Sequence, residues 1–177
     1  MLKSFKLSKL FSSEKTIILT KNIVSVLCFA ILTGLSANLK FEIGTIPITA
    51  QTLFVLLSGV FLGKEKGAYS QLIYVLSGII GVPWFSRGGG IAYILSPTFG
   101  YLLGFIPASY IAGYASKKKS LVLPGLLLAH FSLDFFGSVW LSRSIGLKES
   151  LIIGLFPFVL GDSLKVLITF IIHKLKK

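Results

Sequence analysis

The sequence predicts an all-α membrane protein with six transmembrane helices and both termini in the cytoplasm. Only 14% of its 177 residues are charged and 54% are hydrophobic, whereas a soluble domain carries about 25% charged residues.

Charge-free runs occupy residues 22–39, 43–63, 67–86 and 88–116. A helix of roughly 20 apolar residues crosses the hydrocarbon core of a bilayer. Four such runs cannot be buried inside a soluble domain of this length. A closed barrel would need alternating segments of roughly 10 residues, which the sequence lacks.

The expected spans follow one another along the chain as one domain, residues 22–177. They cover residues 22–39, 46–63, 67–82, 97–115, 121–142 and 148–173. Pro47 suits the first turn of the second span, where a missing N–H costs little. Residues 91–96 are a candidate re-entrant segment before the fourth span. Pro157 and Gly161 are expected to kink or break the sixth span.

The distribution of basic residues predicts the orientation. An even number of spans places residues 1–21, a basic N-terminal arm, on the same side as the C-terminus. That side holds 13 lysines: Lys3, Lys6, Lys9, Lys15, Lys21, Lys64, Lys66, Lys117, Lys118, Lys119, Lys174, Lys176 and Lys177. The other side holds Lys40, Arg87, Arg143 and Lys148, and Lys165 lies inside the sixth span.

Because basic residues collect on the cytoplasmic face, both termini are expected in the cytoplasm and the loop of Arg87 outside. The arm suits an amphipathic helix lying on anionic lipid. The net charge of +12 is thereby explained by loops and tails, and it does not indicate a nucleic-acid partner.

Four ionisable residues fall well inside the expected spans: His130 and Asp134 in the fifth, and Asp162 and Lys165 in the sixth. Intramembrane charges are costly and usually face a cavity or a partner. Asp162 and Lys165 are three residues apart and share one helix face. They form either a salt bridge or a ligand site, in which Asp162 accepts from a ligand N–H and Lys165 meets an anion. The preceding Pro157 and Gly161 favour the site, because irregular backbone at membrane depth usually lines a cavity.

His130 and Asp134 also share a face, four residues apart. They fit an interhelical hydrogen bond or a proton relay, and Asp134 with Lys165 is another possible pair. No third ligand is visible nearby, so no metal site is expected. A proton-coupled carrier or membrane enzyme using His130, Asp134, Asp162 and Lys165 is therefore an alternative function. The stretch "GVFLGKEK" has the wrong spacing for a phosphate-binding loop, so uphill transport would need energy from another protein.

Small residues recur at four-residue spacing in three rows, and such rows let helices approach closely in lipid. The rows are Ala30, Gly34 and Asn38, then Gly59, Gly63 and Gly67, and finally Gly100 and Gly104. Packing within the protein is the default interpretation. A row that faced outward would instead be a docking surface for a membrane partner.

Four stretches together resemble the biotin-specific S components of energy-coupling factor transporters, the BioY family. They are "IPITAQTLFVLLSGVFLGKEKGA" at 46–68, "YVLSGIIGVPWFSRGGG" at 74–90, "SPTFGYLLGF" at 96–105 and "GLFPFVLGDSLKVLI" at 154–168. One of these stretches alone would be weak evidence. Four in the family's order are specific.

The resemblance implies a substrate-binding subunit in the plasma membrane, without enzymatic activity or a cofactor. Such a subunit binds biotin from outside and associates with a transmembrane coupling subunit and two cytoplasmic ATPases. The family's docking surface includes an Ala-x-x-x-Ala pattern, for which Ala30 and Gly34 are the nearest match. An S component for another small vitamin is a further alternative.

For biotin, the resemblance places substrate-binding residues in three of the four stretches: Asp162, Lys165, Arg87, Trp84, Phe85, Tyr74 and Gln51. Biotin has an apolar bicycle, ureido N–H donors and a carboxylate. A site for it needs apolar walls and a few fixed polar groups. Arg87 can pair with the carboxylate, whose geometry its guanidinium matches, while Trp84 and Phe85 cover the bicycle. The alternative for Arg87 is a solvated headgroup contact in a simple glycine turn.

Overall fold

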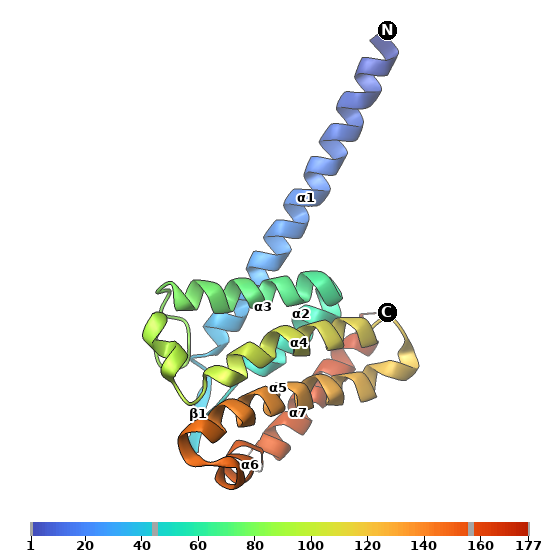
Figure 1. Cartoon of the computed structure of the whole chain (residues 1–177). Helices are drawn as coiled ribbons and strands as arrows, with labels where there is room; N and C mark the ends of the chain where they lie inside the picture. The colour runs from blue at the N-terminus through green and yellow to red at the C-terminus, as the bar shows by residue number, and fades with distance from the viewer. Residues whose placement is uncertain (1, 44–45, 156–157, 177) are drawn as a thin grey trace.

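The structure is a computed structural model that describes residues 2–43, 46–155 and 158–176. Within these residues the chain forms α-helices, two short 3-10 helices and one β-hairpin (Figure 1). The α-helices are α1 (Leu2–Ser36), α2 (Gln51–Leu62), α3 (Lys64–Ile79), α4 (Phe99–Ala115), α5 (Val122–Ile145), α6 (Leu147–Leu155) and α7 (Phe158–Leu175). The remaining elements are β1 (Lys40–Ile43), β2 (Ile46–Thr49), η1 (Ile91–Leu95) and η2 (Lys119–Leu121).

Helices α2 to α7 gather into a bundle, and α1 projects from it at a steep angle (Figure 1). In the described part of the chain, Glu14–Ser36 and Lys119–Ile145 are long and apolar enough to cross a membrane. Helix α5 also exposes large apolar side chains, among them Leu128, Phe131 and Phe135, each more than 50% exposed. An apolar outer face of this kind suits contact with lipid.

Three of the predicted spans differ from the helices found. The predicted boundary at residue 22 does not interrupt α1, which runs as one helix from Leu2 to Ser36. The second span begins with strand β2, and Pro47 lies in that strand instead of the first turn of a helix. The Ile-Pro pair explains this difference, because proline biases the preceding residue toward extended backbone. The sixth span is two helices, α6 and α7. Pro157 lies outside the described residues.

The other expected elements match closely. The third, fourth and fifth spans correspond to α3, α4 and α5, with ends within three residues of those predicted. Residues 91–96 contain the short 3-10 helix η1.

Helix α4 lies at the centre of the bundle and packs against α2, α3 and α5. The close approach of α4 to α2 and to α5 depends on glycine. A Cβ atom on Gly59 would lie 2.8 Å from the Gly113 nitrogen, and one on Gly104 would lie 2.9 Å from the Leu133 Cα. Neither distance leaves room for a side chain. The default interpretation of these two small-residue rows, packing within the protein, is confirmed at both positions.

Candidate functional site

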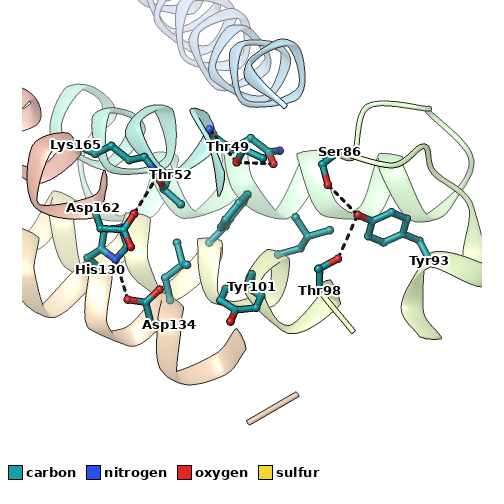
Figure 2. Close-up of a pocket in the computed structure, with 14 residues that line it drawn as sticks. Thr49, Thr52, Ser86, Tyr93, Thr98, Tyr101, His130, Asp134, Asp162 and Lys165 are labelled. Carbon is teal, nitrogen blue, oxygen red and sulfur yellow. Dashed lines mark hydrogen bonds and ion pairs between the residues drawn. The ribbon is translucent and has the colours of Figure 1, made fainter. Parts of the chain in front are cut away.

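A cavity of about 490 Å³, including its open mouth, lies among β2, α2, η1, α4, α5 and α7 (Figure 2). The lining residues are Thr49, Gln51, Thr52, Ser86, Tyr93, Thr98, Tyr101, Leu102, Phe105, His130, Leu133, Asp134, Asp162 and Lys165. Apolar side chains from α4 and α5 form its walls, and its polar groups gather in two places.

The charged end of the cavity consists of His130, Asp134, Asp162 and Lys165. Helical spacing places His130 beside Asp134 on α5 and Asp162 beside Lys165 on α7. The Lys165 Nζ and the His130 Nε2 each lie 3.1 Å from the Asp162 Oδ1. The His130 Nδ1 lies 3.2 Å from the Asp134 Oδ2. The four side chains therefore form one network of polar contacts, which joins α5 to α7.

Four buried polar atoms around this end have no hydrogen-bond partner among the described residues: the Asp162 Oδ2, the Asp134 Oδ1, the Thr52 Oγ1 and the His130 Nε2. Leaving a buried polar group unsatisfied costs about 1–3 kcal/mol. All four residues line the cavity. Two of the atoms are carboxylate oxygens, which accept hydrogen bonds. The charged end is therefore suited to a ligand that brings N–H or O–H donors.

The hydroxyl end of the cavity consists of Ser86, Tyr93 and Thr98 (Figure 2). The Tyr93 hydroxyl lies 3.2 Å from the Ser86 Oγ and 3.4 Å from the Thr98 Oγ1. The Thr98 Oγ1 also lies 2.9 Å from the Ser96 Oγ. These hydroxyl groups satisfy one another, so this end keeps its arrangement without a ligand.

An aromatic wall of Tyr74, Trp84 and Phe85 supports the hydroxyl end. The ring of Tyr74 lies 5.3 Å from that of Trp84 and 5.5 Å from that of Phe85, centre to centre. Phe85 in turn packs against Tyr93 at 4.7 Å. The Gln51 side-chain amide hydrogen-bonds the Tyr74 hydroxyl, which donates to the Trp84 carbonyl at 3.3 Å. The wall is thereby fixed from α2, α3 and the loop that follows α3.

The predicted binding residues thus fall into three groups. Gln51, Asp162 and Lys165 line the cavity. Tyr74, Trp84 and Phe85 lie behind the lining, in the aromatic wall. Arg87 is exposed and follows Ser86, which lines the cavity, so Arg87 belongs to the loop at the rim.

The rim loop, residues 81–90, is held in place by backbone hydrogen bonds. The Phe85 N–H donates to the Gly88 carbonyl at 2.8 Å, and the Gly90 N–H donates to the Gly78 carbonyl at 2.7 Å. Gly88 and Gly90 have φ values of 111° and 100°, which glycine adopts at little steric cost. These two glycines therefore allow the backbone conformation that the rim loop adopts.

The proposed docking pair does not form an exposed surface. Ala30 is 1% exposed. A Cβ atom on Gly34 would lie 2.7 Å and 2.9 Å from two ring atoms of Trp84. Gly34 is buried because the indole of the rim loop packs onto it. Packing within the protein, the default interpretation of the row, describes this pair.

The expectation that no third ligand accompanies His130 and Asp134 is wrong, since Asp162 joins them across the helix interface. The two carboxylates nevertheless contact opposite nitrogens of the imidazole. The Lys165 ammonium also contacts the Asp162 oxygen that faces His130. This geometry fits an ion-pair network better than a metal centre.

Sequence reasoning gave no role to Tyr93, Thr98, Tyr101 or Thr52. A signal existed for three of them, because Thr98 and Tyr101 belong to the stretch "SPTFGYLLGF" and Thr52 belongs to the stretch at residues 46–68. The Tyr101 hydroxyl donates to the Gly154 carbonyl at 3.0 Å and so ties α4 to α6 beside the cavity. Nothing in the sequence pattern distinguishes Tyr93 from other polar residues near helix ends.

Comparison with known proteins identifies the family. Residues 6–177 match the BioY family. The chain belongs to the BioY family. It is 38% identical over 148 residues to a probable biotin transporter BioY of Pyrococcus horikoshii, with 82% of this chain and 89% of that protein covered. It is 33% identical to the biotin transporter BioY of Thermotoga maritima, with 84% and 92% covered.

A solved structure agrees with this assignment. The BioY chain superposes on the crystal structure of the S-component for biotin from an ECF-type ABC transporter with a TM-score of 0.80. The two chains are 26% identical, and the match covers 89% of this chain and 91% of the other. The relatives are transporters and transporter components rather than enzymes, as the sequence predicts.

Proposed function

We propose that this BioY chain is a biotin-binding S component, which captures biotin outside the cell and delivers it through an ATP-driven energy-coupling factor transporter. The observation that carries the proposal is its likeness to the solved S-component for biotin, at a TM-score of 0.80 over 89% of the chain. The cavity supports the proposal chemically, because it combines apolar walls with unsatisfied acceptors, a lysine and a ring of hydroxyl groups.

In the proposed complex, the polar groups of biotin meet the charged end and the rim. The buried Asp162 Oδ2 has no hydrogen-bond partner among the described residues and would accept a hydrogen bond from a ureido N–H. Lys165, 3.1 Å from Asp162, would donate to the ureido carbonyl, and Arg87 at the rim would pair with the carboxylate. The Gln51 amide is already bonded to Thr33, Thr49 and Tyr74, so Gln51 would support the aromatic wall. The wall would in turn hold Tyr93, which lines the cavity, against the bicycle.

Six membrane spans, with both termini in the cytoplasm of a multi-pass plasma-membrane protein, are part of the proposal. The lysine distribution supports this orientation. A cysteine placed at Lys118 should react with an impermeant reagent only from the cytoplasm, and one placed at Ser86 only from outside. Reaction of both cysteines from the same side would contradict the orientation.

The proposed partners are a transmembrane coupling subunit and two cytoplasmic ATPase subunits. The sequence has no phosphate-binding loop, so the energy for uphill transport would come from these partners. Because Ala30 and Gly34 are buried, the docking surface is not assigned to them.

Calorimetric titration of the detergent-purified chain with biotin tests the proposal. We expect saturable one-to-one binding, and mass spectrometry of the purified protein should detect copurified biotin. Binding of a different vitamin in place of biotin would indicate the alternative S component. Uptake that depends on a proton gradient in cells lacking the ATPase subunits would instead indicate a proton-coupled carrier that uses the charged end.

A further inference from the structure

The charged end contains a histidine that the proposed ligand contacts do not use. His130 is 5% exposed and lies between two carboxylates from different helices (Figure 2). Its Nδ1 faces Asp134, one turn further along α5, at 3.2 Å. Its Nε2 faces Asp162 on α7, at 3.1 Å. The Nε2 contact is within ion-pair distance but lacks the angle of a hydrogen bond, since this nitrogen has no hydrogen-bond partner among the described residues.

These contacts favour a charged imidazole. A neutral histidine carries a proton on only one ring nitrogen. Either neutral tautomer would therefore turn an unprotonated nitrogen toward a carboxylate oxygen at about hydrogen-bond distance. The charged ring presents an N–H at both nitrogens. With His130 charged, the two carboxylates are balanced by His130 and Lys165, so the buried network is neutral, as burial at membrane depth requires.

The charged ring has a specific effect on Asp162. Lys165 lies on the same helix as Asp162, so their contact cannot fix α7 relative to α5. His130 contacts Asp162 from α5 and therefore can. Both cations contact the Oδ1 atom, which leaves the buried Oδ2 atom without a partner. In this arrangement the carboxylate has one oxygen bound by the protein and the other available to a ligand.

We propose that charged His130 is a positioning residue, which holds the Asp162 carboxylate for the ligand, so that biotin binding by this chain requires the proton on His130. The inference rests on the proposed function for its ligand. Its structural part, a charged His130 in the empty protein, does not depend on biotin. Loss of the proton would weaken the hold on Asp162 and leave two carboxylates close together without a cation between them.

The groups around His130 restrict what else could titrate with it. Helix α5 contributes Asp134, and α7 contributes Asp162 and Lys165. Helix α4 contributes Tyr101, and η1 contributes Tyr93 further along the cavity. The residues of β2 and α2 that line the cavity are uncharged: Thr49, Gln51 and Thr52. A change in binding between mildly acidic and mildly basic pH that disappears without His130 is therefore assigned to this residue.

Nitrogen NMR of the full-length protein, with histidine labelled by ¹⁵N, tests the charge directly. The sequence has two histidines, His130 and His173, so His173→Gln leaves the signals of His130 alone. We expect both ring nitrogens of His130 to be protonated at neutral pH without biotin. We also expect Asp134→Asn to move its deprotonation to lower pH, because the ring loses one anionic partner. A neutral His130 at neutral pH would overturn the proposal.

Calorimetric titration with biotin across pH tests the positioning role on the same proteins. We expect the parent and the matched control His173→Gln to lose at least about tenfold in affinity as pH rises through the deprotonation of His130. His130→Gln should bind weakly and show no such change over that interval. At low pH, Asp134→Asn should bind biotin as tightly as the parent does. As the pH rises, the affinity of this variant should begin to fall at a lower pH than that of the parent.

The outcomes separate the two proposals. Parent-like affinity and pH dependence in His130→Gln would overturn the positioning role, as would an equal loss of affinity at every pH for Asp134→Asn. A parent protein that binds no biotin at any pH, but has a charged His130 by NMR, would overturn the proposed ligand and leave the charge assignment in place.

Discussion

The two ends of the cavity differ in how their polar atoms are satisfied. At the hydroxyl end, Ser86, Tyr93 and Thr98 bond to one another, and the aromatic wall holds them in position. At the charged end, the ion pairs use only part of the bonding capacity, and carboxylate oxygens of Asp162 and Asp134 remain without partners. The hydroxyl end therefore keeps its arrangement without a ligand, whereas the charged end has acceptor atoms that a ligand with hydrogen-bond donors could satisfy. Ligand binding energy should come mainly from the charged end.

The largest effect is expected for Lys165→Ala. Truncation of one partner of a buried charge pair costs about 2–5 kcal/mol, so biotin affinity should fall by orders of magnitude. Biotinamide contains the same ureido ring and should lose as much. Asp162→Asn should weaken both ligands alike for the same reason. Calorimetry with the two ligands measures these losses.

A double-mutant cycle separates this interpretation from a purely structural salt bridge between Asp162 and Lys165. In the structural case, each single change leaves a buried unpaired charge and lowers the melting temperature, while the doubly neutral protein recovers both folding and binding. If Asp162→Asn combined with Lys165→Ala binds biotin as well as the parent does, the two residues do not contact the ligand.

A smaller but substantial effect is expected for Gly34→Leu, which acts on the aromatic wall. The new side chain would meet the ring of Trp84, since a Cβ atom alone lies within 2.7 Å of it. Overpacking of this kind costs about 1–3 kcal/mol, so both the melting temperature and biotin affinity should fall. Leu35→Phe, at the adjacent and 62% exposed position, is the matched control. If Gly34→Leu failed to assemble with the coupling subunit but kept the melting temperature and biotin affinity of the parent, Gly34 would be assigned to the docking surface after all.

Thr98→Val tests the hydroxyl end and should have a modest effect. It removes the hydroxyl between Tyr93 and Ser96, which costs about 1 kcal/mol of unfolding free energy. Biotin affinity should change by less than about tenfold, and Thr98→Ser should behave like the parent. A loss of affinity as large as that of Lys165→Ala would show that the two ends contribute equally to binding.

The smallest effect is expected for Arg87→Ala. Arg87 is exposed on the rim loop, where salt screens its charge with a Debye length of roughly 8 Å at physiological ionic strength. Biotin affinity should fall a few-fold at low salt and match that of the parent at high salt, whereas Arg87→Lys should retain most of the effect. Equal effects on biotin and biotinamide would exclude a contact between Arg87 and the carboxylate.

Helical periodicity predicts the two residue pairs within the charged end, but it does not predict the contact that joins one pair to the other. The i,i+3 and i,i+4 spacings brought Asp162 to Lys165 and His130 to Asp134, and both contacts are confirmed. The contact between His130 and Asp162 joins residues on two helices. It depends on how those helices are rotated against each other, which one sequence does not encode in any local pattern.

The elements between the long helices were the least predictable. Strand β2 was assigned to a helical span because its apolar residues continue those of α2. The 3-10 helix η1, which carries Tyr93 into the cavity, is too short to have a periodicity. The role of Gly34 depends on an indole 50 positions further along the chain, so the four-residue spacing of small residues indicated close contact without revealing its partner.

The length of α1 has a mechanical consequence. At 1.5 Å per residue, its 35 residues extend for about 52 Å, well beyond the roughly 30 Å of hydrocarbon in a bilayer. Its axis is steeply inclined to that of α5 (Figure 1), so no single bilayer normal is parallel to both. In the proposed six-span arrangement, one of the two helices therefore crosses the lipid obliquely, and its path length depends on the thickness of the bilayer. Where α1 is the oblique helix, a change in bilayer thickness changes its tilt relative to the bundle, and the chain bends at the turn of residues 37–39.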